Sequence, residues 1–250
     1  MEISEQLNVI EKNHFEHFVF LPKKIGCNVT ALNGVSLINC GLQSSMFNIV
    51  YGAPNETSAI TKIKEAFNGQ PFAWWVPPSL HTPELTKALI ENDLIIEANE
   101  HAMICDLTEV TSTEYKANLL IRPVTNKGLL EEFISILEPY DPAARKFYDK
   151  VNEKYLLLEE KLFVGFENEK SVAIGILFLT DNTAGIFSLL TRDDARGKGF
   201  GTDMMRFMLA FAKENGAKSV TLSASSNSGY RIYEHLGFRN IGEFKCFESK

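Results

Sequence analysis

A glycine-rich segment, residues 196–203, combines residue types that suit the binding of a phosphate group. Arg196 and Lys198 alternate there with three glycines, between an apolar run and a predicted helix: Gly197, Gly199 and Gly201. Glycine costs conformational entropy, but it lets a ligand approach the main chain closely. The first amide groups of a helix lack intrahelical partners and carry partial positive charge, so they bind anions. Neighbouring aspartates oppose the two cations, and the anion is therefore expected to be held mainly by backbone groups.

The spacing excludes two nucleotide-binding motifs. No G-x-x-x-x-G-K-[ST] segment occurs, and Thr202 after Gly201 does not continue a G-x-G-x-x-G fingerprint. The strands predicted before the segment also form a meander rather than a βαβ unit. The remaining pattern is Arg-x-x-Gly-x-Gly, and a loop that only turns the chain is its alternative reading.

A second motif lies downstream in "IYEHLGF" (232–238), where Tyr233 precedes the pair Gly237 and Phe238 by four residues. The two motifs, with the strands and helices around them, resemble the GNAT family of N-acetyltransferases over about residues 118–250. The resemblance implies an acyl-CoA N-acyltransferase fold of the α/β (α+β) class, a mixed and mostly antiparallel sheet flanked by helices. It also implies acetyl-CoA as co-substrate and a primary amine as acceptor.

The family pattern assigns roles to individual residues of this chain. The strand end before the turn would offer backbone groups to the pantetheine arm, and the turn would bind the pyrophosphate. The positions assigned to the cofactor are Leu189, Leu190, Thr191, Arg196, Gly197, Lys198, Gly199, Phe200, Gly201, Thr202, Ser226 and Asn227. Of Phe200 only the N–H is expected to serve, since its side chain lies on the apolar helix face. Tyr233 is the predicted general acid toward the departing thiolate.

Two departures from the family pattern affect the mechanism. Ser226, with Asn227 beside it, stands where many relatives have Asn. Thr221 falls near the slot of a Glu general base, and a threonine cannot take a proton from an ammonium. The base is therefore unassigned by the sequence, and a non-catalytic acyl-CoA-binding or partner-docking module is the alternative function.

Hydrophobic periodicity predicts the helices and strands that would position these residues. Helical spacing is expected over 126–137 and after residue 200, and a short helix over 228–238. Strands are expected at 119–124, 161–166, 171–179, 184–190 and 218–224, with a last strand or hairpin over 238–248.

The N-terminal region repeats a similar order without a glycine-rich turn. Helices are expected at 4–17, 57–67 (capped by Thr57 or Ser58) and 82–91, and strands at 46–52, 72–76 and 101–107, with a hairpin over 27–41 turning at Asn33-Gly34. The region resembles the N-terminal halves of two-domain GNAT proteins, which implies a degenerate GNAT-like copy over 1–112 that covers the cleft, beside a GNAT domain over 118–250. The polar segment 107–118 is expected to be a linker or an edge connection. Of Trp74 and Trp75, at least one is expected in the core, because strand neighbours face opposite sides.

Composition narrows the partners. The net charge of −7 argues against general nucleic-acid binding, and no apolar run is long enough for a membrane span. Four widely spaced cysteines are expected to be free thiols in the cytoplasm. His14 and His17 lie one helical turn apart, but no pattern completes a metal site, so packing or exposure is expected for them. The sequence is compatible with a small molecule or a peptide as the amine acceptor, and with a homodimer.

Overall fold

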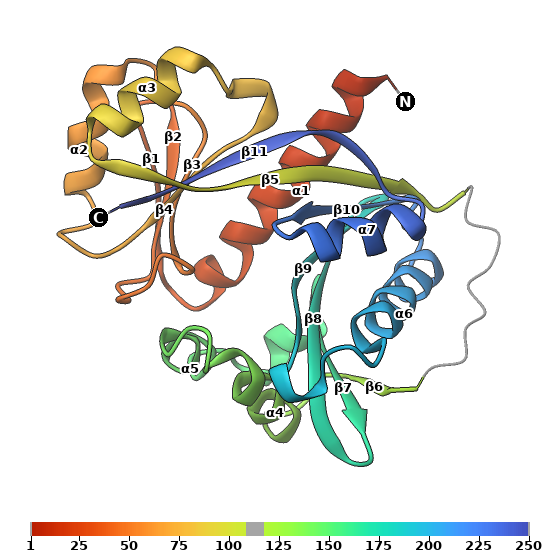
Figure 1. Ribbon diagram of the computed structural model, residues 1–250. Helices are drawn as coiled ribbons and strands as arrows, with labels where there is room; N and C mark the ends of the chain where they lie inside the picture. Colours follow the sequence, from red (N-terminus) through yellow and green to blue (C-terminus); the bar gives the residue numbers. More distant parts are fainter. Residues whose placement is uncertain (1, 109–117, 250) are drawn as a thin grey trace.

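One sheet runs through the whole described chain. The computed structural model describes residues 2–108 and 118–249, apart from the side chains of 227 and 228, and most of the predicted linker lies outside these residues. Within this part of the chain, eleven strands form a sheet in the order β1-β2-β3-β4-β11-β5-β10-β9-β8-β7-β6 (Figure 1). The strands are β1 (Asn28–Leu32), β2 (Val35–Asn39), β3 (Asn48–Tyr51), β4 (Ala73–Val76), β5 (Leu94–Asp106), β6 (Leu120–Pro123), β7 (Glu160–Glu167), β8 (Lys170–Thr180), β9 (Thr183–Thr191), β10 (Ser219–Ala224) and β11 (Arg239–Ser249).

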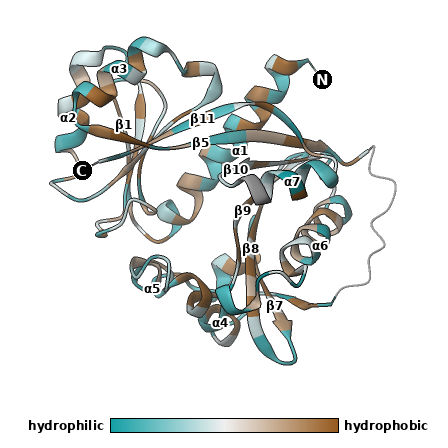
Figure 2. Cartoon of the chain, viewed as in Figure 1, coloured by the Kyte–Doolittle hydropathy of each residue, from teal (hydrophilic) through white to brown (hydrophobic). Residues whose placement is uncertain are grey.

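Helices pack on the sheet at several places. They are α1 (Ile3–Lys24), α2 (Ile60–Glu65), α3 (Pro83–Glu91), α4 (Lys127–Leu137), α5 (Ala143–Tyr148), α6 (Phe200–Glu214) and α7 (Asn227–His235). The long helix α1 contacts β9, β10, β11 and β5 at the middle of the sheet, while α6 packs on β8 and β9 (Figure 1). Figure 2 shows hydrophobic residues along β8 and hydrophilic ones in the loop that joins it to β7. The mixed, mostly antiparallel sheet flanked by helices agrees with the predicted fold class.

The two halves of the sheet share one pairing pattern. Strands β1 to β4 pair antiparallel, antiparallel and parallel, and strands β7 to β10 pair in the same succession. The strand after each set comes from the other half, because β11 pairs with β4 and β5 pairs with β10. Since β5 and β11 also pair with each other over most of their lengths, the two halves are joined at the centre of the sheet.

Local sequence signals account for most element boundaries. Asn33 (φ 50°) and Gly34 (φ 91°) both adopt positive φ, as the predicted two-residue hairpin requires. Thr82 and Asn126 cap α3 and α4 through their side chains. The cap predicted for 57–67 is wrong: a single 3₁₀ turn over Thr57–Ala59 precedes α2, and no side chain caps either element.

Other boundaries depend on tertiary contacts. Helix α1 continues past the predicted end at residue 17 to Lys24, with Pro22 in its last turns. Residues 239–249 form one long strand rather than a hairpin. Helix α5 has no predicted counterpart; its Phe147 and Tyr148 are buried against α4 and the loop before β3.

The central position of β11 predicts that its buried side chains stabilise the fold. Phe247 of β11 is fully buried in the core formed by the N-terminal strands and by α2 and α3. Phe247→Ala is expected to lower the free energy of unfolding by about 3–5 kcal/mol, measured by chemical denaturation. The control Glu243→Ala, on an exposed side chain of the same strand, should change it by less than about 1 kcal/mol. A small effect of Phe247→Ala would mean that β11 does not support the N-terminal core.

Candidate active site

The glycine-rich segment forms an open turn at the start of α6. Gly197 (φ 79°) and Gly199 (φ 84°) adopt left-handed backbone conformations, and no protein atom lies within 4 Å of the position that a Cβ would take on either. The first hydrogen bond of the helix runs from the Asp203 N–H to the Gly199 carbonyl, at 3.0 Å. The amides of the three residues before Asp203 therefore have no helical acceptor and point along the helix axis. This arrangement suits an oxyanion.

Gly201 differs from the other two glycines. Its φ is not positive, and a Cβ there would contact only the Thr191 Oγ1, at an ordinary 3.7 Å. Packing within the protein therefore does not require glycine at this position. The buried side chain of Phe200 packs in the core, as expected from the helix face on which it lies.

The cations of the turn are already paired with carboxylates. Arg196 contacts Asp193 at 2.8 Å and donates to the Tyr140 hydroxyl at 3.1 Å. Lys198 lies 3.0 Å from Glu167. These pairs are solvent-exposed and individually weak, so the two cations can exchange partners with a bound anion.

Strands β9 and β10 separate next to this turn. They pair in parallel only from Thr183 to Ile186 on β9 and from Ser219 to Leu222 on β10, although both strands continue. A bulge lies directly beyond the paired part: Ile176 of β8 opposes Phe187, but Ile174 opposes Leu190. Ser188 in the bulge has a positive φ of 48°. A bulge interrupts the hydrogen bonds between strands and redirects backbone N–H and C=O groups. Here β9 therefore presents backbone groups to the split that are not paired with a neighbouring strand.

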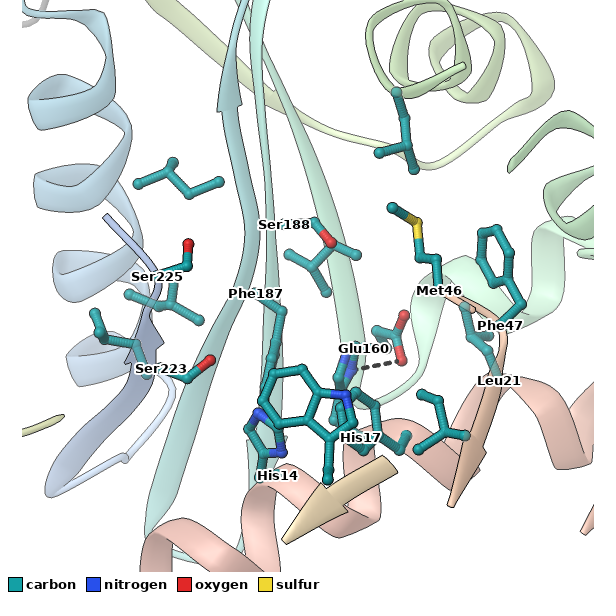
Figure 3. A pocket seen from close by; sticks show the side chains of 18 of the residues that line it. His14, His17, Leu21, Met46, Phe47, Glu160, Phe187, Ser188, Ser223 and Ser225 are labelled. Atoms are coloured by element: carbon teal, nitrogen blue, oxygen red, sulfur yellow. Dashed lines mark ion pairs between the residues drawn. The ribbon is translucent and has the colours of Figure 1, made fainter. Parts of the chain in front are cut away.

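A cavity of about 420 Å³ opens from this split. Leu189 and Leu190 of β9, Tyr233 of α7 and Glu100 of β5 all line it. Figure 3 shows Ser223 of β10 and Ser225, just after that strand, on one side of the cavity. Met46 and Phe47 lie on the other side, and Phe187 and Ser188 lie between them. The predicted strand end and the predicted acid thus share one cavity.

Tyr233 is held by a short, well-capped helix. The Ser226 hydroxyl accepts a hydrogen bond from the Gly229 N–H at 3.1 Å and so caps α7. The Tyr233 hydroxyl lies 3.2 Å from the position of a Cβ on Gly229, so its ring covers the preceding turn. Burial, and secondarily the charge of Glu100, raise the pKa of Tyr233. The phenol therefore keeps its proton at neutral pH.

Glu100 is a functional candidate that the sequence did not identify. It lies on β5 opposite Phe244 of β11, one residue beyond the part of β5 that pairs with β10. Burial raises its pKa, and a hydrogen bond with Ser223 partly offsets that rise. Glu100 and Tyr233 line the same cavity, and the carboxylate contributes to the raised pKa of Tyr233. The strand predicted at 101–107 begins after Glu100, and only the pairing across the sheet brings this carboxylate into the cavity.

The other predicted residues are placed as follows. Ser226 serves as the helix cap, and the side chain of Asn227 lies outside the described residues. Thr221 is buried within the sheet and donates to the Ala184 carbonyl. Trp74 is fully buried and donates to the Gly52 carbonyl at 2.9 Å, whereas Trp75 lines the cavity.

The two histidines of α1 differ in burial. His14 is buried and packs against Trp75 and Phe244, as expected, and the side chain of His17 is 14% exposed; both rings also line the cavity. No group of three or more His, Cys, Asp or Glu side chains that could hold a metal occurs among the described residues. Nor does any described helix combine the length and the apolar composition of a bilayer span.

Comparisons with known proteins concern both sequence and fold. Residues 127–238 match the family model described as Acetyltransferase (GNAT) family. A curated relative, "Uncharacterized N-acetyltransferase YobR" of Bacillus subtilis (strain 168), is 28% identical over 116 residues. That match covers 46% of this chain and 46% of the relative, so the similarity spans about half the length of each protein.

Solved structures resemble nearly the whole chain in fold. A GCN5-related N-acetyltransferase from Kribbella flavida superposes with a TM-score of 0.69 at 14% identity, covering 96% of this chain and 94% of that one. A GCN5-related N-acetyltransferase-like protein from Streptococcus suis gives a TM-score of 0.63 at 13% identity and covers 99% of both chains. At such low identity these likenesses establish the fold alone. The family match assigns residues 127–238 to a GNAT acetyltransferase domain, and the structural likenesses extend a common fold over nearly the whole chain.

Proposed function

We propose that this protein is an N-acetyltransferase that moves an acetyl group from acetyl-CoA to a primary amine. The observation that carries the proposal is the single cavity that joins the split between β9 and β10 to Tyr233 and Glu100. The curated relative in Bacillus subtilis, named as an N-acetyltransferase, supports the same reaction class.

The residues present fit the proposed co-substrate. The open turn offers unpaired amides at Phe200, Gly201 and Thr202 to a diphosphate, and no Cβ occupies the approach at Gly197 or Gly199. The end of β9 from Leu189 to Thr191 lies along the split and would accompany the pantetheine arm. When bound, acetyl-CoA supplies a thioester as acyl donor.

Glu100 and Tyr233 have complementary proton-transfer roles. Glu100 takes the proton that the amine loses as its N–C bond forms, because its raised pKa makes it a stronger base than an exposed glutamate. Tyr233 donates its proton to the sulfur as the C–S bond breaks. Both groups line one cavity, so the proton on Glu100 can return to Tyr233 through the cavity and reset the pair. Thr221 cannot act as the base, and the lack of a base favoured a non-catalytic acyl-CoA-binding protein. Glu100 supplies a base in this proposal.

The N-terminal half has a supporting role in this proposal. Its strands repeat the pairing succession of the C-terminal half, which supports a degenerate copy over 1–112 beside the GNAT domain over 118–250. Ile38, Ile49 and Trp75 from this half, together with α1, line the cavity away from the split. The N-terminal half would therefore shape the acceptor pocket.

Gly201 offers a direct test of the cofactor turn. Gly201→Glu is expected to weaken acetyl-CoA binding at least about tenfold, because the carboxylate would occupy and repel the diphosphate site. An acidic residue in the first turn favours the helix itself, so the variant should fold. Calorimetric titration measures the affinity, and Ala210→Glu, farther along α6, is the control with the same added charge. Gly199→Glu is a poorer choice, since its positive φ strains any side chain. Equal affinity of Gly201→Glu and wild type would remove the cofactor assignment.

Tyr233→Phe tests the acid. The variant keeps the ring packing and loses only the hydroxyl, so acetyl-CoA affinity should stay within about twofold while turnover falls about 10²–10⁴-fold. Release of the CoA thiol with a panel of primary amines measures turnover. Unchanged turnover would exclude Tyr233 as the proton donor.

The pH profile tests Glu100. The base must be ionised, so kcat/KM should fall as the pH drops through the pKa of Glu100, which burial places above the usual glutamate value of 4.5. Glu100→Gln should abolish this acidic limb and lower the plateau. Ser223→Ala, which removes a hydrogen bond that lowers the pKa of Glu100, should move the limb to higher pH. A limb that both variants leave in place would assign the base to another group.

A further inference from the structure

The end of the cavity away from the split contains unsatisfied polar atoms. Among the described residues, four buried side-chain polar atoms lack a hydrogen-bond partner, and three of them belong to residues that line this cavity: His14 Nδ1, His17 Nδ1 and Glu160 Oε2. Buried polar atoms in native proteins are nearly always hydrogen-bonded, because desolvation without a partner is costly. His14 Nδ1 has no hydrogen-bond partner, while His17 Nδ1 and Glu160 Oε2 face each other at 3.4 Å, so this end of the cavity keeps hydrogen-bonding capacity for a ligand.

Glu160 is the centre of this group. Its side chain is only 3% exposed, and its Oε2 lies 3.4 Å from the Nδ1 of His17, a contact that is an ion pair when His17 is protonated (Figure 3). Burial, and secondarily the neighbouring His17, hold the pKa of His14 well below its usual value, so His14 is neutral and can accept a hydrogen bond. The Glu160 carboxylate and the His14 ring therefore offer acceptors to a ligand in the cavity.

The surroundings favour a positive charge. Glu100 and Glu160 line the cavity, and no Lys or Arg does. Aromatic rings enclose the group: His17 stacks on Phe187 at a centroid distance of 3.7 Å, and His14 lies 4.8 Å from Trp75. Aromatic faces attract cations, and a primary ammonium carries three donors and no acceptor, which suits the Glu160 carboxylate and the His14 ring nitrogen.

The two carboxylates lie at different ends of the cavity. Glu160 opposes Phe178 of β8, which in turn opposes Gly185 of β9, four residues before Leu189 at the split. Two strand spacings and four residues of rise separate the backbones of Glu160 and Leu189 by roughly 10–16 Å. Between them lie apolar side chains such as Ile176, Ile186 and Phe187.

Resting on the proposed function, we propose that the acceptor is a diamine with an apolar spacer. Glu160, His17 and His14 bind its distal ammonium, and the near nitrogen reaches Glu100 and the split. The distal site thereby selects acceptors by charge and length, while the spacer contacts the aromatic wall.

Fluorescence of Trp75 provides a binding readout that does not depend on activity. The chain has only two tryptophans, and the other, Trp74, is buried in a separate core. We expect α,ω-diaminooctane to change the emission with an affinity at least about tenfold higher than that of octylamine, and Trp75→Phe to remove the signal. Equal affinities of the two amines, or no binding of either, would overturn the proposal.

A matched pair of variants locates the distal site. Glu160→Gln, which is nearly isosteric, should reduce the affinity for diaminooctane to that for octylamine, whereas Glu159→Gln on the exposed neighbour should leave both unchanged. A diamine preference that survives Glu160→Gln would contradict the assignment, and the comparison of the two amines on wild type decides the matter even if that variant does not fold. If wild type binds the diamine in this way but releases no CoA thiol from acetyl-CoA, the proposed function fails while the distal site stands.

Discussion

The separation of β9 from β10 is the constraint on which the site depends. Parallel strands normally continue their ladder, but here the pairing stops at Ile186 and Leu222 while both strands run on. The bulge at Ser188, with its positive φ, turns β9 away at that point. A sheet that closed here would leave no space between the start of α6 and Tyr233. The split thus opens the cavity that Leu189, Leu190 and Tyr233 line.

Strand exchange between the halves supplies the other wall. β5 from the N-terminal half lies beside β10 and carries Glu100, while β11 lies beside β4 and carries Phe244 under His14. Helix α1 covers the junction and contributes His14 and His17 to the cavity. The chemistry proposed for the GNAT domain therefore depends on residues from outside residues 127–238. The pairing of β5 with β11 joins the two halves in one sheet.

Local patterns in the sequence predicted individual helices and turns better than they predicted which elements pack against one another. The glycine turn, the helix after it and the Asn33-Gly34 hairpin follow from backbone geometry and local hydrogen bonds, and all are present. Glu100, Glu160 and the role of His14 could not be predicted in this way, because strand register and the crossing of α1 bring them together from distant positions. Helix α5 is too short for periodicity to identify and is fixed by the burial of Phe147 and Tyr148. The cysteines, predicted as free thiols, are unbridged.

A crystal structure of the protein with acetyl-CoA would test the central claim most directly. We expect the diphosphate against the amides of residues 197–202, the arm along Leu189 to Thr191, and the sulfur within hydrogen-bonding reach of the Tyr233 hydroxyl, with Glu100 facing the acetyl group. Density for the cofactor on another face of the sheet, or a split that closes when the cofactor binds elsewhere, would contradict it.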